Sequence, residues 1–508
     1  MAGSVLCLKF GNFFWRSSVM ATVHFETLGC KLNQIESESA CKAFSDFGWN
    51  VSVENITSNE VLDEKLVKDT KLCVVNTCTV TTKAEQKGRH TINLLLKKFP
   101  FAVILVTGCY AQVKKDEIEK MDSRIVVLPG TKKDFLAELP RILAEKAETD
   151  IYKNIYKNGI YKTDTSINET LSVQKVACLL KAILESPESK NPAKFALSTD
   201  VFFNHSRSSI KIQDGCGNSC SFCAIHIARG KPVSLEADKV LERVLALEKA
   251  GQNEVVLTGV NLCQYRSLNQ NFDIADLITY LSQNTSSINF RLSSLYPERI
   301  DEKFLSSLKK SRVRPHFHLS VQSGSDAILT RMNRPYSANQ VREAVEKLRR
   351  LYQTEKNIEP FIACDIIVGF PSETEDDFLQ TVKLCKDCNF SWIHAFPFSA
   401  RPNTEAANMK NQIPQETARK RMNILCEIAD NQKRAYIHRF EGKTVKAIVE
   451  KRHDGLCRCV TENFLHAHVN LSSGLEISYL LDHEIDVKIT DTLPIFKECE
   501  CECSVVLF

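Results

Sequence analysis

Short apolar runs alternate with segments of helical spacing in the first part of the chain. Continuous apolar runs are typical of strands covered on both faces, and strand–helix alternation predicts a parallel, doubly wound sheet. The strands are expected at residues 22–28, 72–75 and 103–106, and the helices at residues 36–47, 83–98 and 113–121.

A second strand–helix alternation fills the middle of the chain. Its apolar runs are separated by amphipathic segments, which predicts an incomplete (βα)6 barrel with its chemistry at the carboxyl ends of the strands. The strands are expected at residues 209–213, 254–259, 289–293, 316–322, 361–370 and 391–398. The clearest helices are expected at residues 236–250, 337–352 and 373–388.

The last part of the chain has a different pattern. A long helix at residues 415–440 is followed by short alternating runs, which predict a small antiparallel β-barrel. Its strands are expected at residues 444–449, 456–460, 476–480, 485–489 and 504–508. The predicted fold class is α/β, with an N-terminal doubly wound parallel sheet, a central partial (βα)6 barrel and a small C-terminal antiparallel β-barrel.

These patterns predict three domains and a connecting segment. The domains are expected at residues 20–148, 207–440 and 441–508, and residues 149–206 are expected to be a linker or an insertion. The tetrapeptide Ile-Tyr-Lys-Asn occurs twice in succession from Ile151, which favours a linker of low complexity. The alternative is an insertion that contacts substrate, since long loops are sometimes functional.

The composition of the chain indicates its cellular compartment more clearly than its function. The formal net charge of +4 over 508 residues permits a nucleic-acid partner without requiring one. Twenty cysteines in a long chain without a secretory signal favour a reducing cytosol and metal ligation over disulfides. No run of 18 apolar residues is present, so no membrane span is expected. Residues 1–19 are expected to be an over-long start before Met20, with a targeting peptide as the alternative.

Three cysteines, Cys216, Cys220 and Cys223, form a CxxxCxxC motif. Three thiolates at this spacing hold three corners of a 4Fe-4S cluster and leave the fourth iron without a protein ligand. An open iron binds the amino and carboxylate groups of S-adenosylmethionine and passes it one electron, which cleaves the sulfonium. Zinc is the alternative, with His226 as its local candidate ligand.

Three more cysteines, Cys30, Cys78 and Cys109, each follow a predicted N-terminal strand. All strands of a parallel sheet point the same way, so these strand ends meet at one edge. A single cysteine there is more often a small buried side chain. Three at equivalent positions predict a second three-thiolate cluster site.

Motifs around these cysteines resemble the methylthiotransferase family of radical S-adenosylmethionine enzymes. They are Thr27-Leu28-Gly29-Cys30-Lys31-Leu32-Asn33-Gln34, Asn76-Thr77-Cys78, Thr107-Gly108-Cys109 and the CxxxCxxC motif. The first is most similar to members that modify threonylcarbamoyladenosine beside the tRNA anticodon. The resemblance implies an enzyme that methylthiolates carbon 2 of that adenine, with two 4Fe-4S clusters and S-adenosylmethionine as cofactors.

The resemblance also implies partners and leaves alternatives open. The implied partners are tRNA, an electron donor such as flavodoxin or ferredoxin, and a sulfur source, in the cytoplasm and without a membrane. Sister classes modify isopentenyladenosine in tRNA or an aspartate of a ribosomal protein. An iron–sulfur RNA-binding sensor without turnover is an alternative from another functional class. The chain departs from the family at residues 224–230, which lack the usual Ile-Pro-Tyr, and at Asn403, where glycine is usual.

Polar and glycine residues at the ends of the barrel strands resemble the S-adenosylmethionine pocket of the family, with ordinary turn chemistry as the alternative. They are Gly259, Ser293, Gln322, Ser323, Gly324, Asp365 and Gly369. The carboxylate of a threonylcarbamoyl group needs a cation in its site. Arg401 is the first candidate and Arg229 the second, unless either pairs with a neighbouring carboxylate.

The C-terminal barrel resembles the RNA-binding TRAM domain of the family in position and size. Residues 443–508 contain 7 Lys and Arg against 11 Asp and Glu, which argues against strong phosphate binding. Basic residues on the preceding helix are RNA contacts or an ordinary solvated face: Arg419, Lys420, Arg421, Lys433, Arg434 and Arg439. Cys499, Cys501 and Cys503 alternate at strand spacing. Together with Cys457 and Cys459 they are expected to line a core, with metal binding as the alternative.

Overall fold

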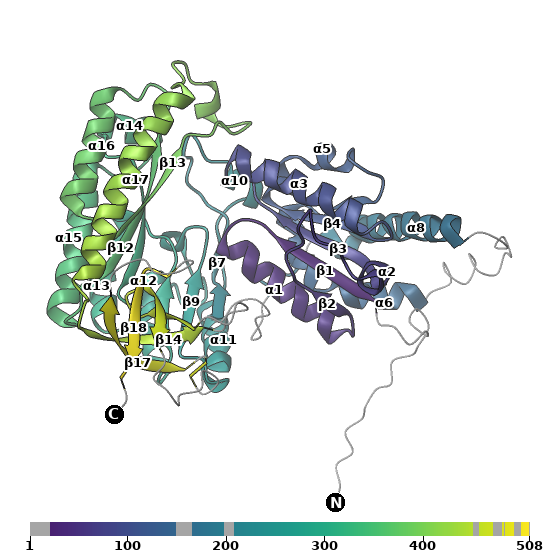
Figure 1. Ribbon diagram of the computed structural model, residues 1–508, viewed down its shortest axis with the longest axis horizontal. Helices are drawn as coiled ribbons and strands as arrows, with labels where there is room; N and C mark the ends of the chain where they lie inside the picture. The colour runs from purple at the N-terminus through teal and green to yellow at the C-terminus, as the bar shows by residue number, and fades with distance from the viewer. Residues whose placement is uncertain are drawn as a thin grey trace, which may run out of the picture. The chain divides into compact units, whose positions relative to one another are not determined.

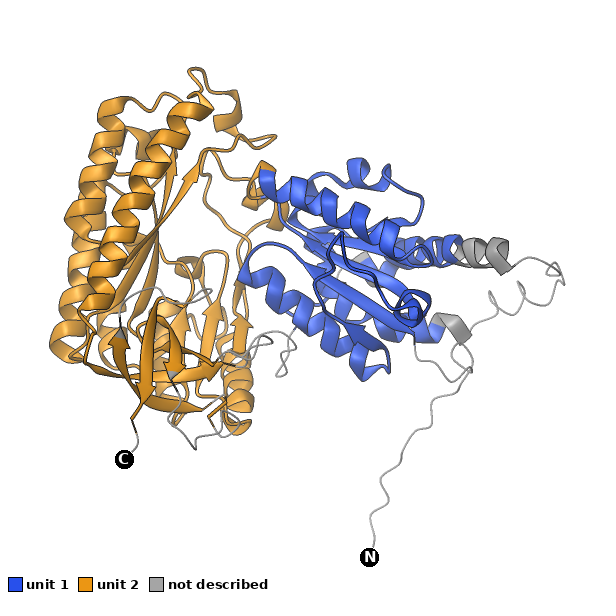
Figure 2. Ribbon diagram, in the orientation of Figure 1, with its two compact units in different colours: residues 1–79, 83–203 blue, residues 80–82, 204–508 orange. Residues whose placement is uncertain are grey.

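The computed structural model describes residues 21–148, 165–190, 192–197, 208–450, 457–470, 480–481, 483–491 and 499–506. The chain divides into two compact units, drawn in blue and orange in Figure 2. Unit 1 comprises residues 1–79 and 83–203, and unit 2 comprises residues 80–82 and 204–508. Residues 1–19 and the tandem repeat that begins at Ile151 lie outside the described residues.

Unit 1 is built on a five-stranded parallel sheet with the order β2-β1-β3-β4-β5 (Figure 1). The central strands β3 and β4 are almost entirely buried, as their continuous apolar sequences require. The predicted doubly wound sheet is therefore confirmed. Its strands are β1 (Thr22–Thr27), β2 (Asn50–Ser52), β3 (Thr70–Thr77), β4 (Val103–Gly108) and β5 (Ile125–Val127). Its helices are α1 (Lys31–Asp46), α2 (Glu64–Asp69), α3 (Thr82–Lys98), α4 (Cys109–Val113), α5 (Lys115–Glu119), η1 (Gly130–Ala137), α6 (Leu139–Glu148), α8 (Thr165–Glu185) and α9 (Pro187–Lys190).

Helix α8 was not expected, because it lies in the segment assigned to a linker or an insertion. Its side chains Val173, Ala177, Leu180 and Leu184 recur every three or four residues and are buried in the core of unit 1. An apolar stripe of this kind is stable only when a neighbouring surface covers it. This part of residues 149–206 therefore belongs to the folded unit.

Unit 2 contains the expected partial barrel as two three-stranded parallel sheets. Parallel bridges from Phe290 to Val313 and from Leu295 to Leu319 join them into one curved wall. The first sheet is β6 (Ser208–Lys211), β9 (Glu254–Thr258) and β10 (Asn289–Leu292), and the second is β11 (His316–Gln322), β12 (Phe361–Val368) and β13 (Trp392–Pro397). The predicted (βα)6 architecture is confirmed.

Helices cover the outer side of this wall, as Figure 1 shows for α15, α16 and α17. They are α10 (Ile225–Arg229), α11 (Ala237–Lys249), η2 (Leu262–Gln264), α12 (Ile274–Asn284), η3 (Pro297–Arg299), α13 (Glu302–Lys309), α14 (Asp326–Arg331), α15 (Ala338–Glu355), α16 (Glu375–Cys388), η4 (Glu405–Asn408) and α17 (Gln415–His438). Among the described residues of either unit, no helix is both long enough and apolar enough to cross a membrane.

The C-terminal strands form a closed barrel in the order β14-β15-β16-β18-β17. They are β14 (Thr444–Glu450), β15 (Arg458–Thr461), β16 (His466–Asn470), β17 (Glu484–Asp491) and β18 (Cys501–Val505). The pair β16–β18 is parallel, so the barrel is not antiparallel throughout as expected. Strand β16 follows β15 in a short hairpin, at residues where no strand was predicted. Most of the strand expected at residues 476–480 lies outside the described residues. Cys459, Cys501 and Cys503 are buried in the core, which confirms their expected packing role.

The C-terminal barrel packs directly against the amino end of the partial barrel. Phe464 stacks on His316 at the start of β11, with ring centroids 4.0 Å apart. Phe361 of β12 and Tyr436 of α17 belong to the same hydrophobic core as the C-terminal strands. The two regions expected as separate domains therefore form one compact unit.

Candidate functional site

The CxxxCxxC loop leaves the short strand β7 (Gln213–Asp214), which pairs antiparallel with β8 (Val233–Ser234). Gly215 follows β7 with φ +72°, and a Cβ there would lie 2.1 Å from the carbonyl oxygen of Lys231. Only glycine fits this turn without displacing the backbone. The amide of Cys216 then donates to the carbonyl of Gly230 at 3.1 Å, so the start of the loop is fixed.

The thiols of this loop are shielded and face hydrogen-bond donors. Cys216 and Cys220 are buried and Cys223 is half-buried. The amide of Asn218 donates to the sulfur of Cys216 at 3.5 Å, and the amide of Ile225 donates to that of Cys223 at 3.4 Å. Burial raises the pKa of Cys223 to about 12 and also raises the pKa of Cys216. These thiols therefore keep their protons until a metal displaces them, and the donors then stabilise the thiolates.

Arg334 is the cation of this site, and sequence reasoning missed it. Its Nη1 donates to the sulfur of Cys220 at 3.0 Å, and its Nη2 donates to the carbonyl of Ser320 at 2.9 Å. The rings of Tyr296 and Tyr336 lie 4.4 and 5.2 Å from the guanidinium carbon. Burial opposes the charge of Arg334, but the surrounding tyrosines and Cys220 raise its pKa, so it stays charged. It follows α14 in a loop far from the cysteines in sequence, and no local pattern marked it.

The side chains of Gln213 and Gln264 brace the cysteine loop. Gln213 Nε2 donates to the carbonyl of Gly215 at 2.8 Å, while its Oε1 accepts from the amide of Asn261 at 2.8 Å. Gln264 Oε1 accepts from the amide of Gly217 at 2.8 Å. The loop is therefore held to the ends of β7 and β9 by side chains that meet its backbone.

The predicted S-adenosylmethionine contacts divide into two groups. Gly259 and Ser293 stand together at the ends of β9 and β10, where the amide of Gly259 donates to Ser293 Oγ at 3.2 Å. Gln322 ends β11 with φ +70° beside an irregularity in the β11–β12 pairing. These positions lie at the carboxyl ends of barrel strands, where ligands bind in this architecture. Their contact with the cofactor stays a prediction.

The second group packs against helices. The amide of Gly324 donates to Thr381 Oγ1 at 3.0 Å, and a Cβ on Gly324 would lie 2.6 Å from the Cα of Thr381. Ser323 Oγ lies 3.3 Å from the same hydroxyl and is fully buried. Gly369, with φ +71°, packs similarly on Ala418 of α17. Close helix contact explains these three residues without a ligand, and a cofactor contact for them stays a prediction.

Asp365 lies on β12 next to two histidines. Its Oδ2 is 2.9 Å from Nε2 of His318 on β11, and both side chains are partly exposed. The sequence analysis assigned Asp365 to the cofactor pocket, and in the structure its carboxylate pairs with a histidine of the neighbouring strand.

The two arginines expected to bind a substrate carboxylate are both buried. Arg229 Nη1 pairs with Asp214 Oδ1 at 2.9 Å, which is the alternative considered for it. Arg401 is buried, with 3% of its surface exposed. Asn403 in the same loop has φ +64°, a left-handed conformation that asparagine tolerates better than most residues.

In unit 1 the three strand-end cysteines stand on neighbouring strands. Thr27 pairs with Asn76 across β1–β3, and Thr77 pairs with Gly108 across β3–β4. Cys78 directly follows Thr77, and Cys109 directly follows Gly108. Gly29, with φ +112°, approaches Cys78 so closely that a Cβ would lie 2.7 Å from the Cβ of that cysteine.

The geometry of this edge is fixed by two asparagines. Asn33 Nδ2 donates to the carbonyls of Leu28 and Thr77 at 2.8 and 3.1 Å, which ties the ends of β1 and β3 together. Asn76 Nδ2 donates to the carbonyl of Asn33 at 3.0 Å. Neighbouring parallel strands therefore bring Cys30, Cys78 and Cys109 to one edge, as the sequence predicted. Their role as cluster ligands stays a prediction.

In the part of the chain that the structure describes, no three or more His, Cys, Asp and Glu side chains form a group able to hold one metal ion. A 4Fe-4S cluster binds each thiolate through a different iron, so its cysteines stand farther apart than the ligands of one ion. In unit 2 the shielded thiols with backbone donors fit that larger group, and in unit 1 Cys78 and Cys109 are buried while Cys30 is exposed.

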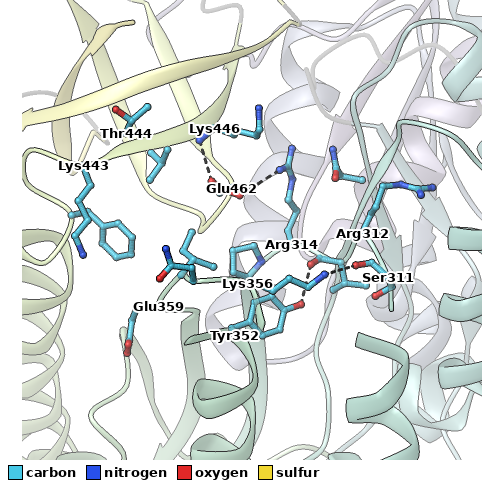
Figure 3. A pocket seen from close by; sticks show the side chains of 17 residues that line it. Ser311, Arg312, Arg314, Tyr352, Lys356, Glu359, Lys443, Thr444, Lys446 and Glu462 are labelled. Atoms are coloured by element: carbon cyan, nitrogen blue, oxygen red, sulfur yellow. Dashed lines mark hydrogen bonds and ion pairs between the residues drawn. The ribbon is translucent and has the colours of Figure 1, made fainter. Parts of the chain in front are cut away.

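A cavity of about 430 Å³ lies at the opposite end of unit 2, between the start of β11 and the C-terminal barrel (Figure 3). Lys356 Nζ donates to the carbonyl of Ser311 at 3.0 Å, and Arg314 lies 3.8 Å from Glu462 and 3.2 Å from Glu254. These cations are engaged by protein groups, so the cavity is a poor site for a phosphate.

Two family models match the chain. The radical SAM superfamily matches residues 210–385, and the uncharacterized protein family UPF0004 matches residues 22–130. The solved structure of the radical S-adenosylmethionine methyltransferase TsrM from Kitasatospora setae, with cobalamin and a [4Fe-4S] cluster bound, aligns with a TM-score of 0.51. It is 14% identical and covers 77% of each chain, so this likeness shows the fold alone.

Relatives of known class align along most of the chain. A threonylcarbamoyladenosine tRNA methylthiotransferase MtaB of Treponema pallidum (strain Nichols) is 41% identical over 90% of this chain and 96% of the relative. The MtaB of Aquifex aeolicus (strain VF5) is 31% identical over 87% of this chain and 95% of the relative. A tRNA-2-methylthio-N(6)-dimethylallyladenosine synthase of Herminiimonas arsenicoxydans is 29% identical over 92% of this chain and 96% of the relative. The chain therefore belongs to the threonylcarbamoyladenosine tRNA methylthiotransferase family of radical S-adenosylmethionine enzymes.

Proposed function

We propose that this chain methylthiolates carbon 2 of threonylcarbamoyladenosine next to the anticodon of tRNA. The observation that carries the proposal is the 41% identity over 90% of the chain to an enzyme named for this substrate. The chain is a radical S-adenosylmethionine enzyme of the methylthiotransferase class and uses 4Fe-4S clusters with S-adenosylmethionine.

The residues present fit two clusters. Cys216, Cys220 and Cys223 would hold the one in unit 2, and Cys30, Cys78 and Cys109 the one in unit 1. When bound, the first cluster supplies the electron that cleaves S-adenosylmethionine, and the second holds the sulfur that receives a methyl group. Buried thiols at the first site and a glycine-lined strand edge at the second support this assignment.

The protein around the unit 2 cysteines has three tasks. Arg334 places a positive charge against Cys220, which offsets the negative charge of the three thiolates. The amides of Asn218 and Ile225 donate to the other two sulfurs. The rings of Tyr296 and Tyr336 cover the guanidinium and keep water from it, which strengthens the interaction.

The cofactor contacts in the barrel form the next part of the proposal. Gly259, Ser293 and Gln322 stand at strand ends where backbone and polar side chains meet a bound ligand. Ser323, Gly324 and Gly369 would act by holding this edge against α16 and α17. Asp365 is kept as a proposed cofactor contact, and Arg401 as a proposed contact of the substrate carboxylate.

Two further partners follow from the reaction. Reductive cleavage needs a one-electron donor, for which we propose a flavodoxin or a ferredoxin. The methylthio sulfur must come from a separate sulfur source. We assign the reaction to the cytoplasm, because twenty cysteines in a chain of this length suit a reducing compartment.

The substrate is tested with two RNAs that differ in one group. Anticodon stem-loops carrying threonylcarbamoyladenosine or isopentenyladenosine are incubated with reconstituted enzyme, dithionite and S-adenosylmethionine. Nucleosides are then analysed by mass spectrometry. We expect the methylthio product from the first RNA. Equal product from the second RNA would instead support isopentenyladenosine as the substrate. The 29% identity to a dimethylallyladenosine synthase is the reason for testing this alternative.

A further inference from the structure

Strand β12 has one face against helices and one face inside the barrel. Cys364 of this strand is fully buried and lies near Cys385 of α16, so its side chain is on the helix side. Burial, and then the neighbouring Cys385, raise the pKa of its thiol. Phe361 and Ala363 pack instead with the core of the C-terminal barrel. Alternation along a strand then puts Asp365 on the inner face with them.

Two histidines flank Asp365 on this inner face. His394 of β13 is its register partner, and His318 of β11 lies on its other side, with Nε2 2.9 Å from Oδ2 of the aspartate. The imidazole rings of His318 and His394 stack with centroids 5.2 Å apart. We call these two residues the histidine pair.

The histidine pair lies close to the cysteine loop. Ser320 stands two residues beyond His318 on the same face of β11. The carbonyl of Ser320 accepts a hydrogen bond of 2.9 Å from Arg334, and the same guanidinium contacts Cys220. Only one layer of side chains therefore separates the histidine pair from the cysteine loop. A substrate that enters the barrel to reach the radical site can contact the pair.

The tautomer of His394 is fixed by its neighbour. Trp392 Nε1 lies 3.2 Å from His394 Nδ1, and an indole nitrogen only donates. Nδ1 is therefore the acceptor, and the proton of a neutral ring is on Nε2. Burial lowers the pKa of His394, so the ring stays neutral near pH 7. Lys433 lies 4.3 Å from the Trp392 ring and holds the indole in place.

The pair thus presents a donor beside an acceptor. His394 offers Nε2–H, and the structure shows no hydrogen bond from that atom to the described residues. His318 donates from Nε2 to Asp365, which leaves its Nδ1 lone pair as an acceptor in the neutral ring. A ureido group has the complementary edge, a carbonyl oxygen beside an N–H. A threonylcarbamoyl substituent on adenine is attached through such a ureido group, and an isopentenyl substituent has neither atom.

We propose that His394 is a specificity-determining residue that donates from Nε2 to the ureido carbonyl of the threonylcarbamoyl group, with His318 accepting from the adjacent N–H. This inference rests on the proposed function and names the contact that selects its substrate. A substrate without the ureido edge leaves a half-buried donor unpaired, which disfavours it.

The test compares the two anticodon stem-loops by affinity, independently of turnover. Binding of each RNA to the reconstituted full chain is measured by fluorescence anisotropy for the wild type, His394→Leu and His394→Gln. The wild type is expected to prefer the threonylcarbamoyl RNA. His394→Leu should weaken that complex by about tenfold and reduce the preference, since one buried hydrogen bond is lost. His394→Gln should keep most of the preference, because its amide N–H replaces the imidazole donor.

A matched control separates this contact from a general effect. His438→Leu makes the same change at an exposed position of α17 and should leave both affinities unchanged. The inference is overturned if His394→Leu keeps the wild-type ratio of affinities, or if Leu and Gln lose it equally. If His394→Leu loses iron, His394→Met, which also has no donor, takes its place and should reduce the preference that His394→Gln keeps. A wild type that binds with the expected preference but thiomethylates neither RNA refutes the proposed function instead.

Discussion

Arg334 Nη1 lies 3.0 Å from the sulfur of Cys220, and the guanidinium that makes this contact is also bonded to the carbonyl of Ser320 on β11. One side chain thus connects the cysteine loop to the inner wall of the barrel. Because the arginine is buried under two tyrosine rings, water does not screen its charge. The site therefore has a fixed positive charge next to one of its thiolates.

Replacing Arg334 with Leu should make the cluster harder to reduce. A reduced cluster carries one more negative charge, so a neighbouring cation stabilises it and raises its potential. Loss of a charge-assisted hydrogen bond of about 2 kcal/mol corresponds to a shift on the order of −100 mV for one electron. The potential is measured by redox titration followed by electron paramagnetic resonance.

Two further variants control this measurement. Arg334→Lys keeps the charge but not the forked geometry, so its shift should be smaller. Arg350→Leu removes an exposed arginine from α15 and should not alter the potential. An unchanged potential in Arg334→Leu, with full iron content, contradicts the assigned role.

Replacing Cys216, Cys220 and Cys223 together with Ala should halve the iron of the reconstituted chain, from about eight atoms to about four. It should also abolish 5′-deoxyadenosine formation, because the open iron is lost. Iron is measured by colorimetric chelation and 5′-deoxyadenosine by chromatography. Cys385→Ala and Cys388→Ala, at buried positions of α16, serve as controls and should keep the iron. A triple variant that still cleaves S-adenosylmethionine would falsify the assignment of this loop.

The N-terminal cysteines give a separable outcome. A Cys30, Cys78 and Cys109→Ala variant should also lose half of the iron, yet it should still release 5′-deoxyadenosine. It should make no methylthio nucleoside, because the proposed cluster that would bind the transferred sulfur is lost. Cys41→Ala in α1 is the matched control, since Cys41 is buried in the core away from the strand ends. Full iron content in the triple variant argues against a cluster at this edge.

The parts of the fold that the sequence predicts best depend on local pattern. The buried strands β3 and β4 follow from uninterrupted apolar runs, and their parallel order brings the N-terminal cysteines together without any long-range information. Asn403, which stands where glycine is usual in the family, has a positive φ. Each of these features is determined within a few residues.

The remaining features depend on contacts between distant segments. Arg334 contacts Cys220 across 114 residues, and nothing in the sequence around either residue marks the pair. Arg229 was expected to serve a substrate, but it is paired with Asp214, fifteen residues away. The parallel pairing of β16 with β18 is also set by how the barrel closes, which alternation within a strand does not reveal.

Arg421 provides the last prediction, because its expected role changes most. The sequence placed it among basic residues that face RNA or solvent, but it is buried and its Nη1 lies 2.6 Å from Glu373 Oε2. The same carboxylate oxygen accepts from the amide of Gly369 at 2.6 Å, so the pair supports the end of β12. Removing one partner of a buried pair leaves the other charge uncompensated, which typically costs about 3–5 kcal/mol.

Arg421→Met should therefore lower the free energy of unfolding by about 3 kcal/mol at pH 7, measured by urea denaturation. Lys420→Met, which removes an exposed lysine paired with Glu416, should change it by less than about 0.5 kcal/mol. Burial already raises the pKa of Glu373, and loss of the arginine should raise it further. A carboxyl whose folded pKa exceeds its unfolded value binds more protons in the folded state, so lowering the pH stabilises that state. The deficit of Arg421→Met relative to the wild type should thus shrink as the pH falls from 7 toward 5. A deficit that is equal for Arg421→Met and Lys420→Met, or that grows in acid, contradicts the buried pair.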